Sequence, residues 1–131
     1  MTYLLIFIGG GLGSIARFAA SGLVARLFGE TCPWGTILVN VTGSFLIGMI
    51  AAMTGPDGRW LVSPSAREFL MIGVLGGYTT FSSFSLQTLT LARDGEWLHA
   101  GANVLLSVAL CLVAVWLGCM VAANFNSAKG P

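Results

Sequence analysis

The sequence predicts an all-α membrane protein in which four helices cross the bilayer and form a single domain over residues 1–131. Hydrophobic residues make up 56% of the chain and charged residues only 8%, whereas a soluble domain carries roughly 25% charged residues. The charges are also segregated, because residues 31–56, 69–92 and 97–128 contain none. Each of these segments is longer than the roughly 20 residues that a helix needs to cross the hydrocarbon core.

The four predicted helices follow from the apolar runs and from the turns between them. The first run has no basic segment ahead of it and leads into further apolar sequence, so we do not expect a cleaved signal peptide. The connections at 29–35, 54–65 and 93–97 are short and carry Gly or Pro, the residues that mark chain reversals. Apolar runs of this length without period-two alternation favour helices over barrel strands. We therefore expect helices at 3–27, 35–54, 67–93 and 99–123.

The third predicted helix contains GGYTTFSSFS (76–85), where six hydroxyl side chains interrupt an apolar run. Gly73, Gly76 and Gly77 lie at or just before this stretch, and glycine is a poorer helix former than alanine by about 1 kcal/mol. We predict that the helix is broken near its middle; the alternative is an unbroken helix with a glycine-rich packing face. Non-helical backbone at membrane depth persists only where it is buried in protein or lines a cavity. Carbonyls freed by a break would suit a hard cation.

Each predicted helix carries one stripe of small or polar residues at helical spacing. Close packing explains most of these stripes, since small residues let membrane helices approach one another. Asn40 and Arg17 need a further explanation, because an unpartnered amide is costly in the membrane and an intramembrane arginine marks a functional site or an aqueous vestibule. The glycines assigned to packing are Gly9, Gly13, Gly43, Gly48 and Gly118.

The charges give almost no signal for the orientation of the chain. Arg59, Arg67 and Lys129 fall on the side of the termini, and Arg26 and Arg93 fall on the other side. The positive-inside rule needs an excess on the cytoplasmic side. Insertion in both orientations is therefore one interpretation, and a single orientation set by a weaker signal is the other. Insertion in both would permit an antiparallel homodimer, which four helices would need to enclose a pathway.

The segments GGGLGSIAR (9–17), GTILVNVTGSFLIG (35–48) and GVLGGYTTFSSFS (73–85) resemble the signature segments of the Fluc/CrcB fluoride channels. Their order and spacing also agree, and the resemblance covers the whole chain. It implies an antiparallel, dual-topology homodimer with two fluoride pathways in the cell inner membrane. It also implies a structural sodium ion at the dimer axis, held by main-chain oxygens of Gly76 and Thr79 from both subunits.

The resemblance further implies which side chains line the fluoride pathway. Phe81 and Phe84 would line the pore, where the positive edges of their rings could face an anion; ordinary core packing is the alternative for each ring. Hydroxyl and amide donors would replace the water that fluoride loses, without a full charge that would hold the ion too tightly. Arg17 would lie at an entrance vestibule, and Asn103 stands where some relatives carry Tyr. The donors implied for the pathway are Asn40, Ser107, Ser82, Ser83, Ser85 and Thr36.

Passive release of fluoride, driven by the membrane potential, would need no ATP site or coupling group, and the sequence shows none. A proton-coupled exporter of the small multidrug resistance type has a similar size, but it needs a carboxylate within the membrane. All five acidic residues fall in predicted loops or helix ends. A non-transporting membrane scaffold, which would use the polar stripes only to join helices, is a further alternative. An enzyme is not expected, since His99 is the only histidine and no nucleophile–base pair is visible; nothing indicates nucleic-acid binding.

Overall fold

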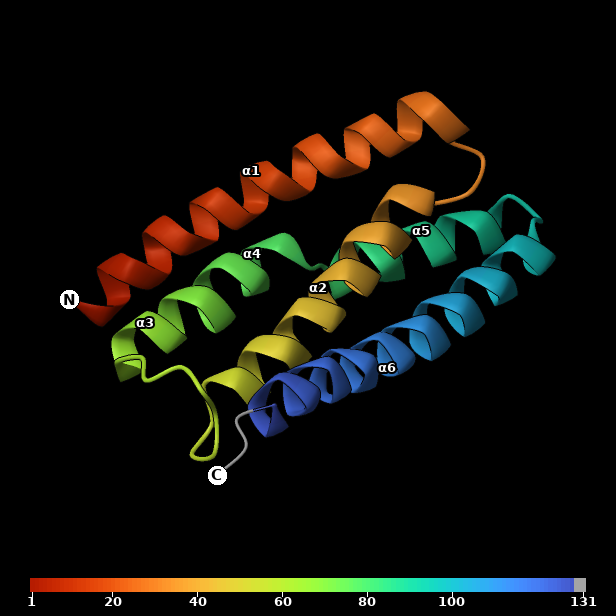
Figure 1. Ribbon diagram of the computed structural model, residues 1–131. Coiled ribbons are helices and arrows are strands. Elements are labelled where there is room, and N and C mark those ends of the chain that lie inside the picture. Colours follow the sequence, from red (N-terminus) through yellow and green to blue (C-terminus); the bar gives the residue numbers. More distant parts are fainter. Residues whose placement is uncertain (129–131) are drawn as a thin grey trace.

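The computed structural model describes residues 1–128, whose helices form four long helical spans (Figure 1). Three spans are continuous: α1 (Thr2–Phe28), α2 (Trp34–Met53) and α6 (Trp97–Ser127). The third span along the chain consists of α3 (Pro64–Glu68), the π-helix η1 (Phe69–Leu75), α4 (Gly76–Tyr78) and α5 (Phe81–Arg93). All four are long and apolar enough to cross a membrane. The predicted all-α class with four spans is confirmed for the described residues; Lys129, used in the charge comparison, lies outside them.

The third and fourth spans extend furthest beyond the ranges that the sequence predicted. The third begins at Pro64 rather than residue 67, because the Ser63 hydroxyl oxygen accepts a hydrogen bond from the Ala66 amide at 3.2 Å and caps the helix. Proline at the first helical position needs no N–H partner. The fourth span continues to Ser127 rather than residue 123. Near its end the Arg59 guanidinium donates to the Phe125 carbonyl oxygen at 2.8 Å, which satisfies one of the last helical carbonyls.

The third span is broken at Thr79 and Thr80, as predicted. Both residues have extended backbone, with φ −84° and ψ 157° at Thr79 and φ −153° and ψ 111° at Thr80. Gly76 is helical, with φ −63° and ψ −37°, so the break does not lie at the glycines themselves. Thr80 instead starts a new helix, because its hydroxyl oxygen accepts from the Ser83 amide at 3.2 Å.

The glycines serve helix packing. A Cβ added to Gly9 would lie 2.9 Å from the Phe69 carbonyl oxygen, and one added to Gly13 would collide with the Val74 carbonyl oxygen. Helix α1 therefore packs backbone to backbone against η1 and α4. Close contacts also confirm the packing role predicted for the other three glycines. Gly48 of α2 lies against the α6 backbone and Gly118 of α6 lies against the α2 backbone, whereas Gly43 lies against the Thr79 side chain of the third span.

The break directs the two halves of the third span to different neighbours. Segments η1 and α4 pack along α1, whereas α5 packs on α6, and α2 contacts both halves (Figure 1). The second half of α1 therefore stays apart from α5. The outward faces are apolar, with Phe7, Phe18 and Leu105 among the exposed side chains, as expected for surfaces that meet lipid tails.

Candidate functional site

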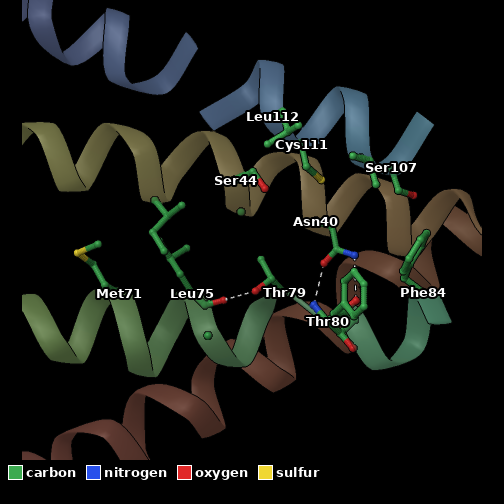
Figure 2. A pocket seen from close by; sticks show the side chains of 15 residues that line it. Asn40, Ser44, Met71, Leu75, Thr79, Thr80, Phe84, Ser107, Cys111 and Leu112 are labelled. Carbon is green, nitrogen blue, oxygen red and sulfur yellow. Dashed lines mark hydrogen bonds between the residues drawn. The ribbon is translucent and has the colours of Figure 1, made fainter. Parts of the chain in front are cut away.

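The backbone at the break is held by a single side chain, Asn40 of α2 (Figure 2). The Thr80 amide donates to Asn40 Oδ1 at 2.7 Å, and Asn40 Nδ2 donates to the Thr80 carbonyl oxygen at 2.9 Å. One amide therefore satisfies both polar groups of a buried, extended residue, which the bilayer cannot do. This pairing also explains how an amide is tolerated in mid-membrane, and it leaves one Asn40 N–H free.

A groove of about 420 Å³ opens beside the break, between α2, the third span and α6 (Figure 2). It brings together residues that lie far apart in the sequence, and Ser44 and Cys111 join them from α2 and α6. Ser44 was not assigned to the pathway, although its position one turn after Asn40 on α2 is a signal that could have found it. The predicted site residues that line this groove are Asn40, Gly76, Thr79, Phe81, Phe84 and Ser107.

The two phenylalanines of the groove have different surroundings. Their ring centroids lie 5.1 Å apart with an interplanar angle of 48°. Phe84 is 7% exposed and packs within the chain, whereas Phe81 is 75% exposed. A tilted pair of this kind can present ring edges, which carry partial positive charge, toward a ligand. Core packing accounts for Phe84 but not for Phe81.

A second cavity of about 700 Å³ lies between the second half of α1 and α5, and we call it the vestibule. Arg17, Thr36 and Ser83 line it, and the role expected of Arg17 at an entrance stays a prediction. Within residues 1–128 Arg17 has no salt-bridge partner, so its charge is available to anions that enter. Thr80 lines both the vestibule and the groove, which places the break between the two cavities.

Two further residues of the vestibule were not identified from the sequence. Gln87, one turn after Ser83 on α5, has a buried Oε1 atom without a hydrogen-bond partner in the described part of the chain. Cys32 also borders this space. Burial raises the pKa of the Cys32 thiol above its ordinary value, so the group is a protonated and weakly reactive thiol at neutral pH.

The predicted hydroxyl track is divided by its local hydrogen bonds. Thr80 Oγ1 donates to Ser83 Oγ at 3.1 Å and lies 3.2 Å from Ser82 Oγ, which must then be the donor to Thr80. The Ser85 hydroxyl donates to the Phe81 carbonyl oxygen at 2.9 Å. Ser83 keeps its own proton free on the vestibule side, whereas the protons of Ser82 and Ser85 are already used. Ser82 and Ser85 border neither the groove nor the vestibule.

The carbonyls expected to hold a cation also belong to this region. In a continuous helix the Gly76 carbonyl would accept from the Thr80 amide, but that amide donates to Asn40. Gly76 and Thr79 both line the groove, and Gly76 is exposed on the surface of the chain. Among residues 1–128 no group of three or more His, Cys, Asp or Glu side chains is placed to bind a metal. Main-chain oxygens at the break are thus the donors that fit a hard cation here.

The fold and the site together define a multi-span membrane protein whose broken third span separates a largely apolar groove with a few polar groups from a vestibule lined by Arg17 and Glu30. Residues 4–119 match the family described as "CrcB-like protein, Camphor Resistance (CrcB)", and the chain belongs to this family. The resemblance seen in the sequence is therefore confirmed.

Curated relatives match nearly the whole chain. A protein of Opitutus terrae is 63% identical over 98% of this chain and 97% of its own length. Proteins of Methylocella silvestris and Rhodospirillum rubrum are 58% and 56% identical, covering 99% and 96% of this chain and 99% and 98% of their own. All three bear the name "Fluoride-specific ion channel FluC". The expectations of a multi-pass membrane protein that is not an enzyme are confirmed by this family.

Proposed function

We propose that the protein is a fluoride-selective channel through which fluoride leaves the cell passively across the inner membrane. The observation that carries the proposal is the break at Thr80, which borders both cavities and which Asn40 holds open. Hydroxyl, amide and aromatic groups line the groove, and no Lys or Arg does. An anion can leave such a site, because its donors carry only partial charge. The relatives named as fluoride-specific channels supply the identity of the ion.

Passive transport agrees with the placement of the acidic residues. In the described chain Glu30, Asp57, Asp94 and Glu96 lie between spans, and Glu68 lies in the first turns of the third span. None is placed in the middle of the membrane, where a proton-coupled mechanism needs a carboxylate. A membrane potential that is negative inside drives an anion outward by about 2.3 kcal/mol per 100 mV.

The proposal includes an antiparallel, dual-topology homodimer. Phe81 is 75% exposed on the single chain and Gly76 is exposed as well, so the groove is open on one side. An ion pathway open to lipid is untenable, and a second copy of the chain would close it. The positive charges outside the membrane are nearly balanced, with Arg59, Arg67 and Lys129 on one side and Arg26 and Arg93 on the other, and this permits both orientations. In the dimer, the Gly76 and Thr79 carbonyls of the two copies would together hold the sodium ion.

Ion efflux from liposomes that contain the purified protein tests the function. We expect fluoride efflux without chloride efflux, and we expect Phe81→Ile to abolish it, since the isoleucine side chain has no aromatic edge. Fluoride efflux that survives this substitution would keep the channel and reject the role of Phe81. A folded protein that releases neither ion would refute the channel and favour a membrane scaffold.

A further inference from the structure

Asn103 of α6 is a second amide of the membrane region; unlike Asn40 it is fully buried, and it lies outside the groove. It is 1% exposed, and both ends of its amide are paired. Its Nδ2 donates to Thr88 Oγ1 on α5 at 2.8 Å, and its Oδ1 accepts from Ser107 Oγ at 3.3 Å. The Thr88 hydroxyl in turn donates to the Phe84 carbonyl oxygen at 2.8 Å. These bonds form one chain that starts and ends at residues of the groove wall, Ser107 and Phe84.

The direction of this chain is determined by the donors available. Thr88 has one hydroxyl proton, which is used by the Phe84 carbonyl, so Thr88 Oγ1 can only accept from Asn103. The amide nitrogen of Asn103 must therefore face Thr88, and its oxygen must face Ser107. Ser107 is consequently the donor in its contact with Asn103.

The hydrogen bond between Ser107 and Asn103 is the longest of the three, and therefore the weakest. Its length of 3.3 Å exceeds the roughly 2.5–3.0 Å typical of O–H···O hydrogen bonds. The Ser107 proton is therefore held, but loosely, and an acceptor in the groove can compete for it. Ser107 can turn this proton toward an anion and return it to Asn103 when the anion moves on, so the buried hydroxyl is never left without a partner.

We propose that Asn103 is a positioning residue for the pathway, and that, held by Thr88 of α5, it acts by orienting the Ser107 hydroxyl. This inference rests on the proposed fluoride channel. It assigns a function to Asn103 itself, because the amide can accept from Ser107 and donate to Thr88 at the same time. It also predicts that Thr88, which lines neither cavity, matters for fluoride flux.

Fluoride efflux from liposomes, measured for a set of matched variants, tests the proposal. We expect Asn103→Leu and Thr88→Val to slow fluoride efflux about tenfold, the factor that corresponds to ~1.4 kcal/mol and to the loss of one or two internal hydrogen bonds. Thr88→Ser keeps the hydroxyl and should restore wild-type efflux. Thr90→Val is the control, because it makes the same change on the exposed face of α5, away from both cavities.

A double substitution separates positioning from plain packing. In the Ser107→Ala background, Asn103→Leu should slow efflux by less than about twofold, since the hydroxyl that it orients is absent. An equal, roughly tenfold effect with and without Ser107 would show that Asn103 acts only by packing, and would overturn the proposal. Wild-type efflux from Ser107→Ala itself would overturn it too, because Asn103 would then have no pathway residue to orient.

The side-chain amide resonances of Asn103 in detergent micelles provide a readout that does not depend on transport. We expect protection from hydrogen exchange in the wild type and in Thr88→Ser, and its loss in Thr88→Val. Fluoride, but not chloride, should shift these resonances only when Ser107 is present. Protected resonances that do not respond to fluoride, in a protein that releases no fluoride, would refute the proposed function and the positioning role while leaving the hydrogen bonds in place. Unprotected resonances in an active channel would refute the positioning role alone.

Discussion

The substitution Asn40→Leu tests whether the break in the third span depends on one amide. It keeps a side chain of similar size but removes both bonds to Thr80, at 2.7 and 2.9 Å. Thr80 is 8% exposed, so water cannot replace the lost partners. A buried backbone group without a partner costs about 1–3 kcal/mol, so two of them cost about 2–6 kcal/mol. This is a large fraction of the roughly 5–15 kcal/mol by which typical folded proteins are stable.

Denaturant and thermal unfolding of the purified protein in detergent micelles would measure this loss. Ser44→Ala is the matched control, because Ser44 lies one turn further along α2 in the same groove and is not bonded to the break. We expect the control to stay within about 0.5 kcal/mol of the wild type. A loss below about 1 kcal/mol for Asn40→Leu, with the fold intact, would mean that the extended backbone at Thr80 is stable without its partner, and the account of the break would be wrong.

Four further outcomes follow from the structure. Gly13→Ala should destabilise the protein by about 1–3 kcal/mol, because the added Cβ would meet a backbone carbonyl. Gly11→Ala is the control and should leave stability unchanged, because its Cβ would meet no atom within 4 Å. Unfolding in micelles measures both. A charged methanethiosulfonate reagent should block fluoride efflux by modifying Cys111 in the groove, and Cys111→Ala should abolish the block. Arg17→Gln should slow efflux more at low than at high ionic strength, because salt screens the vestibule charge. Replacing sodium with a large organic cation should lower thermal stability if the carbonyls at the break hold sodium, and an unchanged unfolding temperature would argue against that ion.

The number and type of the spans could be predicted because they depend on local composition. Each span lies in a segment with few or no charges, and the structure moves most predicted ends by only a few residues. The largest shift is at the end of the fourth span, from residue 123 to Ser127. The start of the third span moves from residue 67 to Pro64 because of the Ser63 cap, a single side-chain contact inside a segment that was assigned to a loop. The sequence also indicated the break, since hydroxyl side chains cluster there.

The cause of the break could not be predicted, because it depends on residues forty positions apart. Asn40 pairs with Thr80 across two spans, and no local pattern shows which carbonyl or amide a distant side chain will meet. The same limit applies to Asn103 and Thr88, which come together only because α5 packs on α6. Glycine propensity pointed to the correct region for a partly wrong reason, since Gly76 and Gly77 are both helical and Gly77 serves close packing against Gly10.

The hydrogen bonds around the break determine how many donors an anion would meet. Thr79 and Ser85 donate their protons to carbonyl oxygens of their own span at 2.9 Å. The neutral donors that remain around the break include the Ser83 and Thr36 hydroxyls in the vestibule. In the groove they include the second Asn40 N–H, the Ser44 hydroxyl and the loosely held Ser107 hydroxyl. A small number of neutral donors, spread over two cavities, would stabilise a partly dehydrated anion at each step without trapping it at any one. The many hydroxyls of the third span therefore serve mainly to satisfy the protein's own backbone and caps, and selectivity must arise from the few that do not.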